Sequence, residues 1–294
     1  RPRTWAPNPH LWVHGYWAWD WANSVEQVAS LDPDRGFVET RPPYGNYGFR
    51  IGNRFQFLNV LEELGRGGDY ALDVDAGLVY FLEPEDAGQG GDLLLSLLEE
   101  PILAVRGAAD IRVEGLVFEA ARGHGILLAD ADRALVRDCT VRNVGNHGIQ
   151  VLGGRGVQVR DNTVHDCGDG GIHVLGGNRA TLERADGAID NNHIHHIATW
   201  TRCYQPAILL GGVGLSARHN LIHDCPHTAI LFWGNDMAIE SNEIYSVVLE
   251  TGDAGAIYTG RDYTFRGNEV SRNYIHHLGG VGMGTMGIYN DDCV

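Results

Sequence analysis

Side chains that could act on a carbohydrate gather in the C-terminal part of the chain. Aromatic rings can stack on sugar rings, and a pair of carboxylates can supply the acid together with the base or nucleophile of glycosidic bond cleavage. One arginine accompanies them and can bind polar groups of a ligand. The group comprises His227, Trp233, Asn235, Asp236, Glu250, Asp253, Tyr258, Arg261, Asp262, Tyr289, Asp291 and Asp292.

A simpler interpretation exists for each acidic residue in this group. Asp and Glu often cap turns and keep an acidic surface soluble. For any single acid this interpretation is the better one, whereas the cluster as a whole favours a functional site. The cluster can form only if the fold brings distant parts of the sequence onto one face, so the elements that position it must be identified.

An internal repeat identifies those elements. A small residue followed by Ile recurs at Ile126, Ile149, Ile172, Ile208, Ile230, Ile257 and Ile288, with spacings of 23, 23, 36, 22, 27 and 31 residues. A second phrase places Asn before an apolar residue at Asn162, Asn192, Asn220, Asn242 and Asn273, and Gly115 and Cys139 take the same place in earlier repeats. A constant core phrase with variable spacers is typical of a solenoid with loop insertions.

The repeats read as strands and not as helices. Short β-branched runs such as Val157–Val159 lie between Gly and Asn turns, and the L-x-x-L-x-L phrase of leucine-rich repeats is absent. We therefore predict an all-β right-handed parallel β-helix over residues 91–294, in which the Asn residues point inward and stack. The longest spacers between the isoleucines are 173–207, 231–256 and 258–287. Counted outward from each isoleucine, Leu231, Tyr258 and Tyr289 form one exposed column. Trp233, Gly260 and Asp291 form the next column.

The first ninety residues follow a different pattern and predict a small β-rich unit over 1–90, packed on the solenoid. Trp17, Trp19 and Trp21 alternate along a strand, where they form either a platform for sugars or, as we prefer, core that joins the unit to the solenoid. Residues 58–64 predict a short helix that ends at Gly65. Residues 70–73 and 78–82 predict a hairpin.

Composition excludes several classes of partner. The formal net charge is −16, and every basic residue is Arg, so neither nucleic acid nor an anionic membrane surface is expected as a partner. No apolar run is long enough to span a bilayer, and the chain does not open with a signal peptide. The five cysteines match no zinc motif, and Cys167 and Cys225, two coils apart, are expected to be buried and free.

Histidines form a further column beside the Asn residues. His165, His195, His223 and His276 occupy it, with Tyr245 between the last two. Rings on neighbouring coils would stack outward without a metal, so we expect no metal site and no cofactor.

Several phrases resemble bacterial right-handed β-helix proteins of glycoside hydrolase family 141, the fucosidase and xylanase group. The resemblance covers nearly the whole chain and is more specific for the fold than for the activity. It rests on residues 12–21, 58–64, 70–73, 77–81, 226–230, 234–236, 251–258, 260–262 and 288–292.

The resemblance implies a glycosidase that acts on a plant or algal polysaccharide or oligosaccharide. It implies Asp253 and Asp291 as the catalytic pair, with Asp292 as a competitor, and the other polar and aromatic residues of the cluster as substrate-binding groups. Asn290 departs from the pattern, which has an apolar residue there. The resemblance also implies secretion or a periplasmic location and a monomer. Because the sequence stops within a coil, we expect it to be a fragment of a longer protein.

Two other functions are compatible with the fold. A polysaccharide lyase needs a base, which Arg261 or a His would have to supply because Lys is absent. A non-catalytic carbohydrate-binding or surface solenoid needs no catalytic pair. If Asp253 and Asp291 do form a pair, the chain must bend near Ala254 and Gly255 so that their carboxyl groups lie about 5 to 10 Å apart, and at least one should have a raised pKa.

Overall fold

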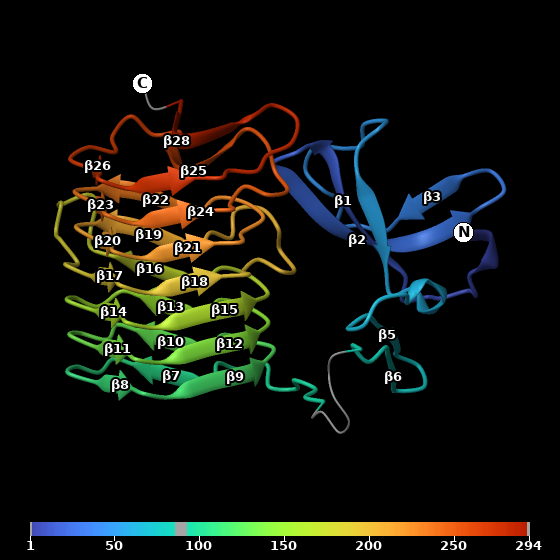
Figure 1. Cartoon of the computed structure of the whole chain (residues 1–294), viewed down its shortest axis with the longest axis horizontal. Helices are drawn as coiled ribbons and strands as arrows, with labels where there is room; N and C mark the ends of the chain where they lie inside the picture. The colour runs from blue at the N-terminus through green and yellow to red at the C-terminus, as the bar shows by residue number, and fades with distance from the viewer. Residues whose placement is uncertain (1, 86–92, 293–294) are drawn as a thin grey trace. The chain divides into compact units, whose positions relative to one another are not determined.

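The computed structural model describes residues 2–85 and 93–292, and the chain divides into two compact units, Arg1–Leu94 and Leu95–Val294. The larger unit is a solenoid of stacked coils with three parallel sheets, which is the predicted right-handed parallel β-helix (Figure 1). The smaller unit consists of antiparallel strands. No helix within the described ranges is long and apolar enough to cross a membrane.

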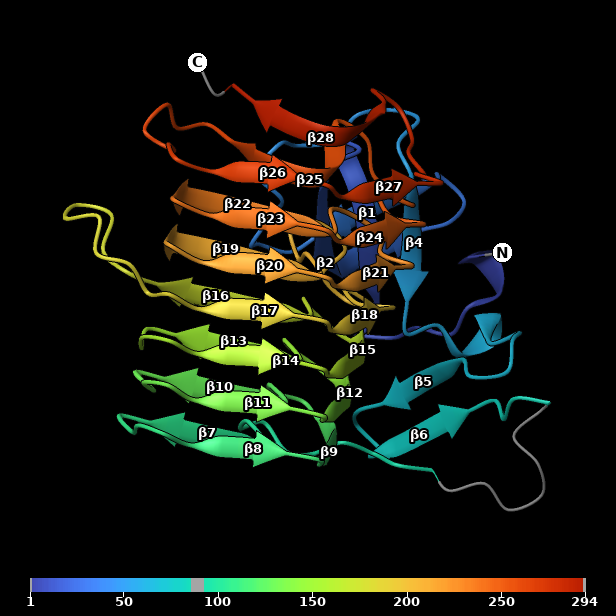
Figure 2. The same cartoon turned by 60° about the vertical axis from the view of Figure 1, so that its left-hand side comes forward.

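Each coil of the solenoid contributes one strand to each sheet, and the coils stack one above another (Figure 2). The first sheet carries the isoleucine phrase. Its strands are β7 (Leu103–Arg106), β10 (Ile126–Ala129), β13 (Ile149–Leu152), β16 (Ile172–Gly176), β19 (Ile208–Val213), β22 (Ile230–Asn235), β25 (Ala254–Gly260) and β28 (Thr285–Asp291).

The other two sheets consist of shorter strands. The second contains β8 (Arg112–Glu114), β11 (Leu135–Arg137), β14 (Gln158–Arg160), β17 (Ala188–Asp190), β20 (Ser216–Arg218), β23 (Ala238–Glu240) and β26 (Glu269–Ser271). The third contains β9 (Val117–Ala121), β12 (Thr140–Val144), β15 (Thr163–Cys167), β18 (His193–His195), β21 (Leu221–His223), β24 (Glu243–Tyr245) and β27 (Tyr274–His276).

The isoleucine column sets the register of the first sheet, as the sequence predicts. Ile126 pairs with Ile149, and the same pairing continues through every coil to Ile257 with Ile288. The side chains of Ile126, Ile208 and Ile230 are fully buried. Burying an aliphatic side chain contributes about 1.5 to 3 kcal/mol, so this repeated column is a principal source of stability for the solenoid.

The asparagine column forms the predicted inward ladder at the bend between the second and third sheets. The side-chain amide of each Asn donates to the Oδ1 atom of the next, at 2.9 Å from Asn162 to Asn192 and 3.0 Å from Asn192 to Asn220. The same Oδ1 atoms accept the backbone N–H one coil below. Because four of the five are almost fully buried, the ladder satisfies polar groups that water cannot reach.

The histidine column on the third sheet stacks as predicted. Ring centroids are 4.8 Å apart for His165 and His195 and 5.0 Å apart for His195 and His223, with nearly parallel planes. Tyr245 continues the stack to His276 at 5.1 Å. Within residues 2–85 and 93–292, no group of three or more His, Cys, Asp or Glu side chains is placed to hold a metal ion.

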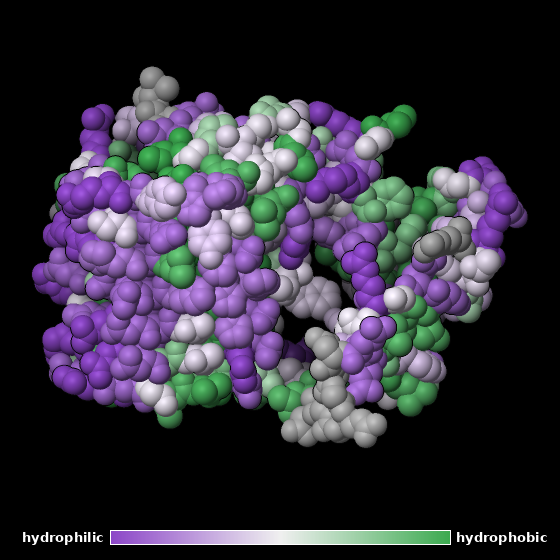
Figure 3. Space-filling view, viewed as in Figure 1, coloured by the Kyte–Doolittle hydropathy of each residue, from purple (hydrophilic) through white to green (hydrophobic). Residues whose placement is uncertain are grey.

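The cysteines in the described part of the chain are free and buried, as predicted for Cys167 and Cys225. Burial raises the pKa of both of these thiols far above the usual range. Polar side chains cover most of the solenoid face in Figure 3, which agrees with a core confined to the interior of the coils.

The N-terminal unit contains one four-stranded sheet in the order β3-β2-β1-β4 and a separate hairpin. The sheet strands are β1 (Trp12–Trp19), β2 (Ala22–Asp32), β3 (Phe37–Thr40) and β4 (Phe55–Leu58), and the hairpin strands are β5 (Tyr70–Asp73) and β6 (Leu78–Phe81). Single 3₁₀ turns occur at η1 (Pro2–Thr4) and η2 (Leu61–Glu63). The hairpin matches the prediction.

The helix predicted over residues 58–64 is wrong. Leu58 ends strand β4, and only the single turn of η2 follows it. The backbone of Phe55–Leu58 pairs instead with β1, so sheet pairing overrides the local helix signal. In the predicted tryptophan row, Trp17 and Trp19 are half-buried, while Val13 and Tyr16 of the same strand are buried. Trp19 stacks on Trp21, with Arg50 over its ring at 3.7 Å.

Candidate functional site

The candidate site forms where strands β25 and β28 lie side by side on the first sheet. Tyr258 pairs with Tyr289, and Gly260 pairs with Asp291. Leu231 on β22 pairs with Tyr258, so the predicted column of Leu231, Tyr258 and Tyr289 is confirmed. The second predicted column is confirmed only between Gly260 and Asp291, because the pairing of β22 with β25 ends at Leu231.

Asp291 accepts hydrogen bonds from two residues of the neighbouring coil. The Tyr258 hydroxyl donates to its Oδ2 atom at 2.6 Å, and the Arg261 guanidinium donates to the same oxygen at 3.1 Å. Burial raises the pKa of Asp291, but the bonds from Tyr258 and Arg261 outweigh burial and leave the pKa below its usual value. Asp291 is therefore held as a carboxylate, and the expected raised pKa is wrong for this residue.

Asp253 accepts a hydrogen bond from the other tyrosine of the pair. The Tyr289 hydroxyl donates to Asp253 Oδ1 at 2.9 Å, and the same hydroxyl interacts with the Asp291 carboxylate. Burial and the bond to Asp253 raise the pKa of Tyr289 to about 12, so its phenol keeps the proton that it donates.

The tyrosine contacts are reciprocal between the two coils. Tyr258 on β25 reaches Asp291 on β28, whereas Tyr289 on β28 reaches Asp253 immediately before β25. Their rings are 5.5 Å apart and nearly perpendicular, which is the edge-to-face arrangement that aromatic pairs prefer. Each carboxylate thus depends on a donor from the coil above or below it.

A turn before β25 brings Asp253 toward this cluster. Asp253 has a φ of 52°, in the left-handed region, and its N–H donates to Gly284 O at 2.8 Å. A Cβ added at Gly255 would lie 2.7 Å from the Cβ of Tyr289, so any side chain at this position would collide with Tyr289. The chain therefore bends beside Ala254 and Gly255, where the sequence requires a bend if the two aspartates are to meet.

A loop between β18 and β19 adds residues that the sequence did not single out. Tyr204 on this loop has its ring 4.9 Å from His227 and 6.5 Å from Tyr258. Arg202 donates two hydrogen bonds to the Glu250 carboxylate and holds the loop in place. Glu250, for which the sequence predicts a substrate contact, thus also anchors this loop.

His227 is buried beneath Tyr204 and is neutral at ordinary pH. Burial lowers its pKa to about 4. Its Nδ1 atom lies 2.8 Å from Thr251 Oγ1, and the Thr251 hydroxyl lies 3.3 Å from Pro226 O. If Thr251 donates to that carbonyl, His227 must donate through Nδ1, which leaves Nε2 unprotonated. His227 thus supports the site from below.

Three other residues predicted to bind substrate are bound to the protein itself. Arg179, on the loop between β16 and β17 (yellow in Figure 2), donates to Asn235 Oδ1 at 3.1 Å and to Asp262 Oδ2 at 3.4 Å. Thr264 donates to the other oxygen of Asp262. Asp236 pairs with Arg184 at 3.8 Å. These side chains stabilise loops and do not join the carboxylate pair.

The last two predicted residues lie at the edge of the cluster. Asp292 is mostly exposed, 3.8 Å from Arg261 Nε, which also contacts Asp291. The ring of Trp233 lies over Gly211, where an added Cβ would be 2.4 Å away. Of the twelve residues in the predicted cluster, five meet directly: Asp253, Tyr258, Arg261, Tyr289 and Asp291.

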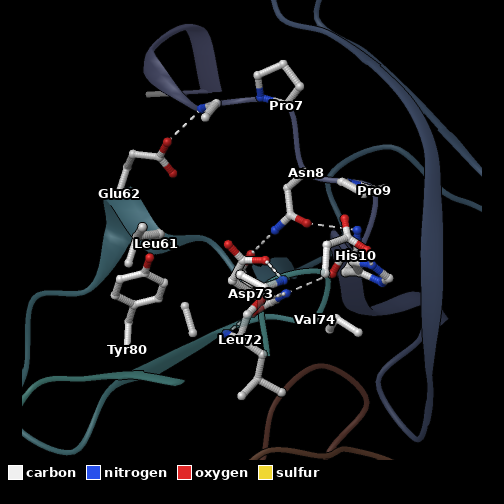
Figure 4. A pocket seen from close by; sticks show the side chains of 15 residues that line it. Pro7, Asn8, Pro9, His10, Leu61, Glu62, Leu72, Asp73, Val74 and Tyr80 are labelled. Atoms are coloured by element: carbon white, nitrogen blue, oxygen red, sulfur yellow. Dashed lines mark hydrogen bonds and ion pairs between the residues drawn. The ribbon is translucent and has the colours of Figure 1, made fainter. Parts of the chain in front are cut away.

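A separate cavity of about 540 Å³ lies within the N-terminal unit. Figure 4 shows Asn8, His10 and Asp73 at its centre, with Glu62 and Tyr80 on its wall. The polar groups are mostly engaged, since Asn8 donates to Asn59 O at 2.7 Å and Glu62 accepts from the N–H of Ala6 at 2.6 Å. These bonds tie the N-terminal segment to Asn59 and η2, and we assign the cavity no chemistry.

Comparisons with known proteins agree with this fold. The model of the family described as "Right handed beta helix region" matches residues 102–186. A solved structure titled "Glycoside hydrolase" superposes on the whole chain with a TM-score of 0.72, at 14% identity over 68% of that protein. No curated protein sequence matches significantly.

Two further solved structures are more distant. A lacto-N-biosidase from Eubacterium ramulus covers 70% of this chain and 47% of its own, at 13% identity and a TM-score of 0.35. The tailspike protein gp49 of Pseudomonas phage LKA1 covers 98% of this chain and 58% of its own, at 11% identity and a TM-score of 0.35. The match to the structure titled "Glycoside hydrolase", at 14% identity, supports the fold alone.

Proposed function

We propose that the protein is a glycoside hydrolase that cleaves a plant or algal polysaccharide with Asp253 and Asp291 as its catalytic pair. The reciprocal tyrosine contacts carry this proposal: Tyr258 donates to Asp291, Tyr289 donates to Asp253, and the two rings are 5.5 Å apart, so both carboxylates border one aromatic pair. The similarity to a structure titled "Glycoside hydrolase" supports it.

The two aspartates differ in their surroundings, and the difference suggests their roles. Asp291 accepts from Tyr258 and from a cation, so it stays ionised and serves as the base or nucleophile. Asp253 accepts from neutral Tyr289 and is the member of the pair that can carry the proton for the leaving group. The anomeric form of the product, read by NMR, decides whether Asp291 attacks directly or activates water.

A lyase mechanism fits this arrangement less well. A lyase needs an unprotonated base beside the sugar and a free cation for the uronate carboxylate. The bonds to Asp291 raise the pKa of Arg261 further above its already high value, so this residue cannot act as the base. Its charge is also engaged by Asp291.

A substrate panel with matched variants tests the proposal. Purified protein is incubated with soluble plant and algal polysaccharides, and new reducing ends and ultraviolet absorbance are both measured. We expect reducing ends without absorbance, and a loss of at least a hundredfold in kcat for Asp253→Asn and Asp291→Asn. The control is Asp161→Asn, an exposed acid in a solenoid turn, which should keep full activity.

Three outcomes would contradict the proposal. Absorbing products would indicate a lyase. Full activity in both aspartate variants would remove the catalytic pair. Retention on polysaccharide without any cleavage would indicate a binding solenoid. A polysaccharide substrate also leads us to propose a secreted or periplasmic protein, which fractionation of the producing cells would test.

A further inference from the structure

An exposed tryptophan stands on the same edge of the solenoid as Asp253, because both residues lie in turns that lead from the third sheet to the first. Trp200 lies on the loop between β18 and β19, and its side chain is 56% exposed. It is the most exposed tryptophan of the described residues, ahead of Trp12 at 40% and Trp233 at 36%. The large flat indole ring of tryptophan is well suited to stack on the apolar face of a sugar ring.

The loop that carries Trp200 is held to the coil below it. The N–H groups of Ala198, Thr199 and Trp200 donate to Asp169 O, Cys167 O and Gly168 O at 2.7, 3.0 and 2.9 Å. The edge of the Trp200 ring lies over Gly168, where an added Cβ would be 3.0 Å from Cδ1. The ring is therefore exposed but fixed, so binding would not have to order it first.

Arg202 ties the other side of this loop to the candidate site. It donates to Ala198 O at 2.8 Å and makes two bonds to the Glu250 carboxylate. Tyr204, two residues further on, faces Tyr258, which donates to Asp291. One loop thus carries an aromatic ring near the carboxylate pair and a second ring farther from it.

Polar side chains lie near Gly168, the residue on which the Trp200 ring packs. Asp169 is half-buried next to Gly168 and interacts electrostatically with His124 and His147, whose rings are 5.2 Å apart. In such an arrangement the ring can bind the apolar face of a sugar and the polar groups can bind its hydroxyls.

The distance between Trp200 and the carboxylate pair follows from the coil spacing. Trp200 packs on the turn before β16, whereas Asp253 lies on the turn before β25, and the first sheet runs β16, β19, β22, β25. Three strand spacings amount to about 14 Å along the solenoid axis. A pyranose unit is about as long as one coil is high. A glycan bound along this edge, with the glycosidic bond to be cleaved at Asp253, would therefore place the sugar ring about three units away on Trp200.

We propose that Trp200 is a distal subsite that stacks on a pyranose ring of a glycan bound along the solenoid axis. This inference deepens the proposed function, since it makes the substrate an extended chain and not a terminal disaccharide. Asp169, His147 and His124 then contact the hydroxyl groups of the stacked sugar.

Affinity electrophoresis tests the subsite without requiring catalysis. Native gels contain soluble xylan, xyloglucan, galactomannan or fucoidan, and the variants are Trp200→Ala, Trp200→Phe and Trp12→Ala. We expect at least one polysaccharide to retard the wild-type protein, and Trp200→Ala to weaken that binding about tenfold or more. Trp200→Phe should retain most of it, and Trp12→Ala, a tryptophan of the N-terminal unit, should retain all of it.

Kinetics then separate the subsite from the catalytic pair. The substrates are oligosaccharides of increasing length from the polysaccharide that is cleaved. Trp200→Ala should lower kcat/KM for the long ones and leave kcat/KM for the shortest cleaved one unchanged. Asp291→Asn should abolish cleavage at every length but keep the retardation in the gel. Equal retardation of Trp200→Ala and wild type, or no retardation of the wild type in any gel, would overturn the subsite. Retardation that needs Trp200 in a protein without hydrolysis would sustain the subsite and remove only the proposed activity. A melting curve like that of the wild type excludes misfolding of Trp200→Ala as the cause.

Discussion

Replacing Asn192 with alanine tests whether the asparagine ladder stabilises the solenoid. Asn192 is 2% exposed, and its Oδ1 atom accepts from the backbone N–H of Asn162 at 3.0 Å and from the side-chain amide of Asn162 at 2.9 Å. Alanine leaves both donors without an acceptor in a dry interior. At about 1 to 3 kcal/mol for each of the two unsatisfied groups, the unfolding free energy should fall by about 2 to 6 kcal/mol.

Urea unfolding followed by circular dichroism measures this loss, and the same ladder supplies the control. Asn273 accepts two equivalent bonds from Asn242, at 3.0 and 2.9 Å, but it is only half-buried, so water can replace its side chain. Asn273→Ala should therefore cost less than half as much. If Asn192→Ala lowers the unfolding free energy by less than about 1 kcal/mol, with an unchanged denaturant slope, the reasoning is refuted. The hydrogen bonds of the ladder would then not be needed to satisfy the buried polar groups.

Other features of the chain give predictions of different kinds. Arg261 lowers the pKa of Asp291, so Arg261→Met should raise that pKa and move the acidic limb of the pH–activity profile to higher pH. Because Arg261 is mostly exposed, the shift should be under about one pH unit. A shift of the acidic limb to lower pH would contradict this prediction. Gly212 has a φ of 120°, and an added Cβ would lie 1.8 Å from Gly176 O. Thermal melts should therefore show that Gly212→Ala destabilises the protein by more than about 2 kcal/mol. Gly287→Ala, where an added Cβ would meet open space, should stay near wild type. Burial raises the pKa of the Cys225 thiol, so a disulfide reagent should label it only after unfolding, and rapid labelling of the native protein would argue against that burial.

The sequence was most informative where a physical requirement repeats in every coil. An inward Ile and an inward Asn recur because each coil must bury the same face and satisfy the same bend, so the register, the Asn ladder and the histidine stack could all be predicted. The helix expected over residues 58–64 failed because local propensity is a weak signal and pairing of β4 with β1 overrides it.

The site was harder to predict because its loops differ from coil to coil. The sequence suggested ligand contacts for Asn235 and Asp262, and it could not show that Arg179, more than fifty residues earlier, donates a hydrogen bond to each of them. No periodicity connects these positions. Tyr204 was missed for the same reason, since only the folded loop brings it to Tyr258. The lowered pKa of Asp291 likewise depends on an orientation of Arg261 that spacing cannot reveal.

The separation of register from spacer length has an evolutionary consequence. The buried Ile and Asn columns align the coils whether 22 or 36 residues lie between successive isoleucines. Insertions in the turn after the third sheet therefore do not disturb the fold, and selection can vary them one coil at a time. Lengthening the loop that carries Trp200 and Tyr204 would change which ring faces Tyr258 while the coil that carries Tyr258 stays in place. The scaffold can thus diversify its ligands through one loop without first evolving a new core.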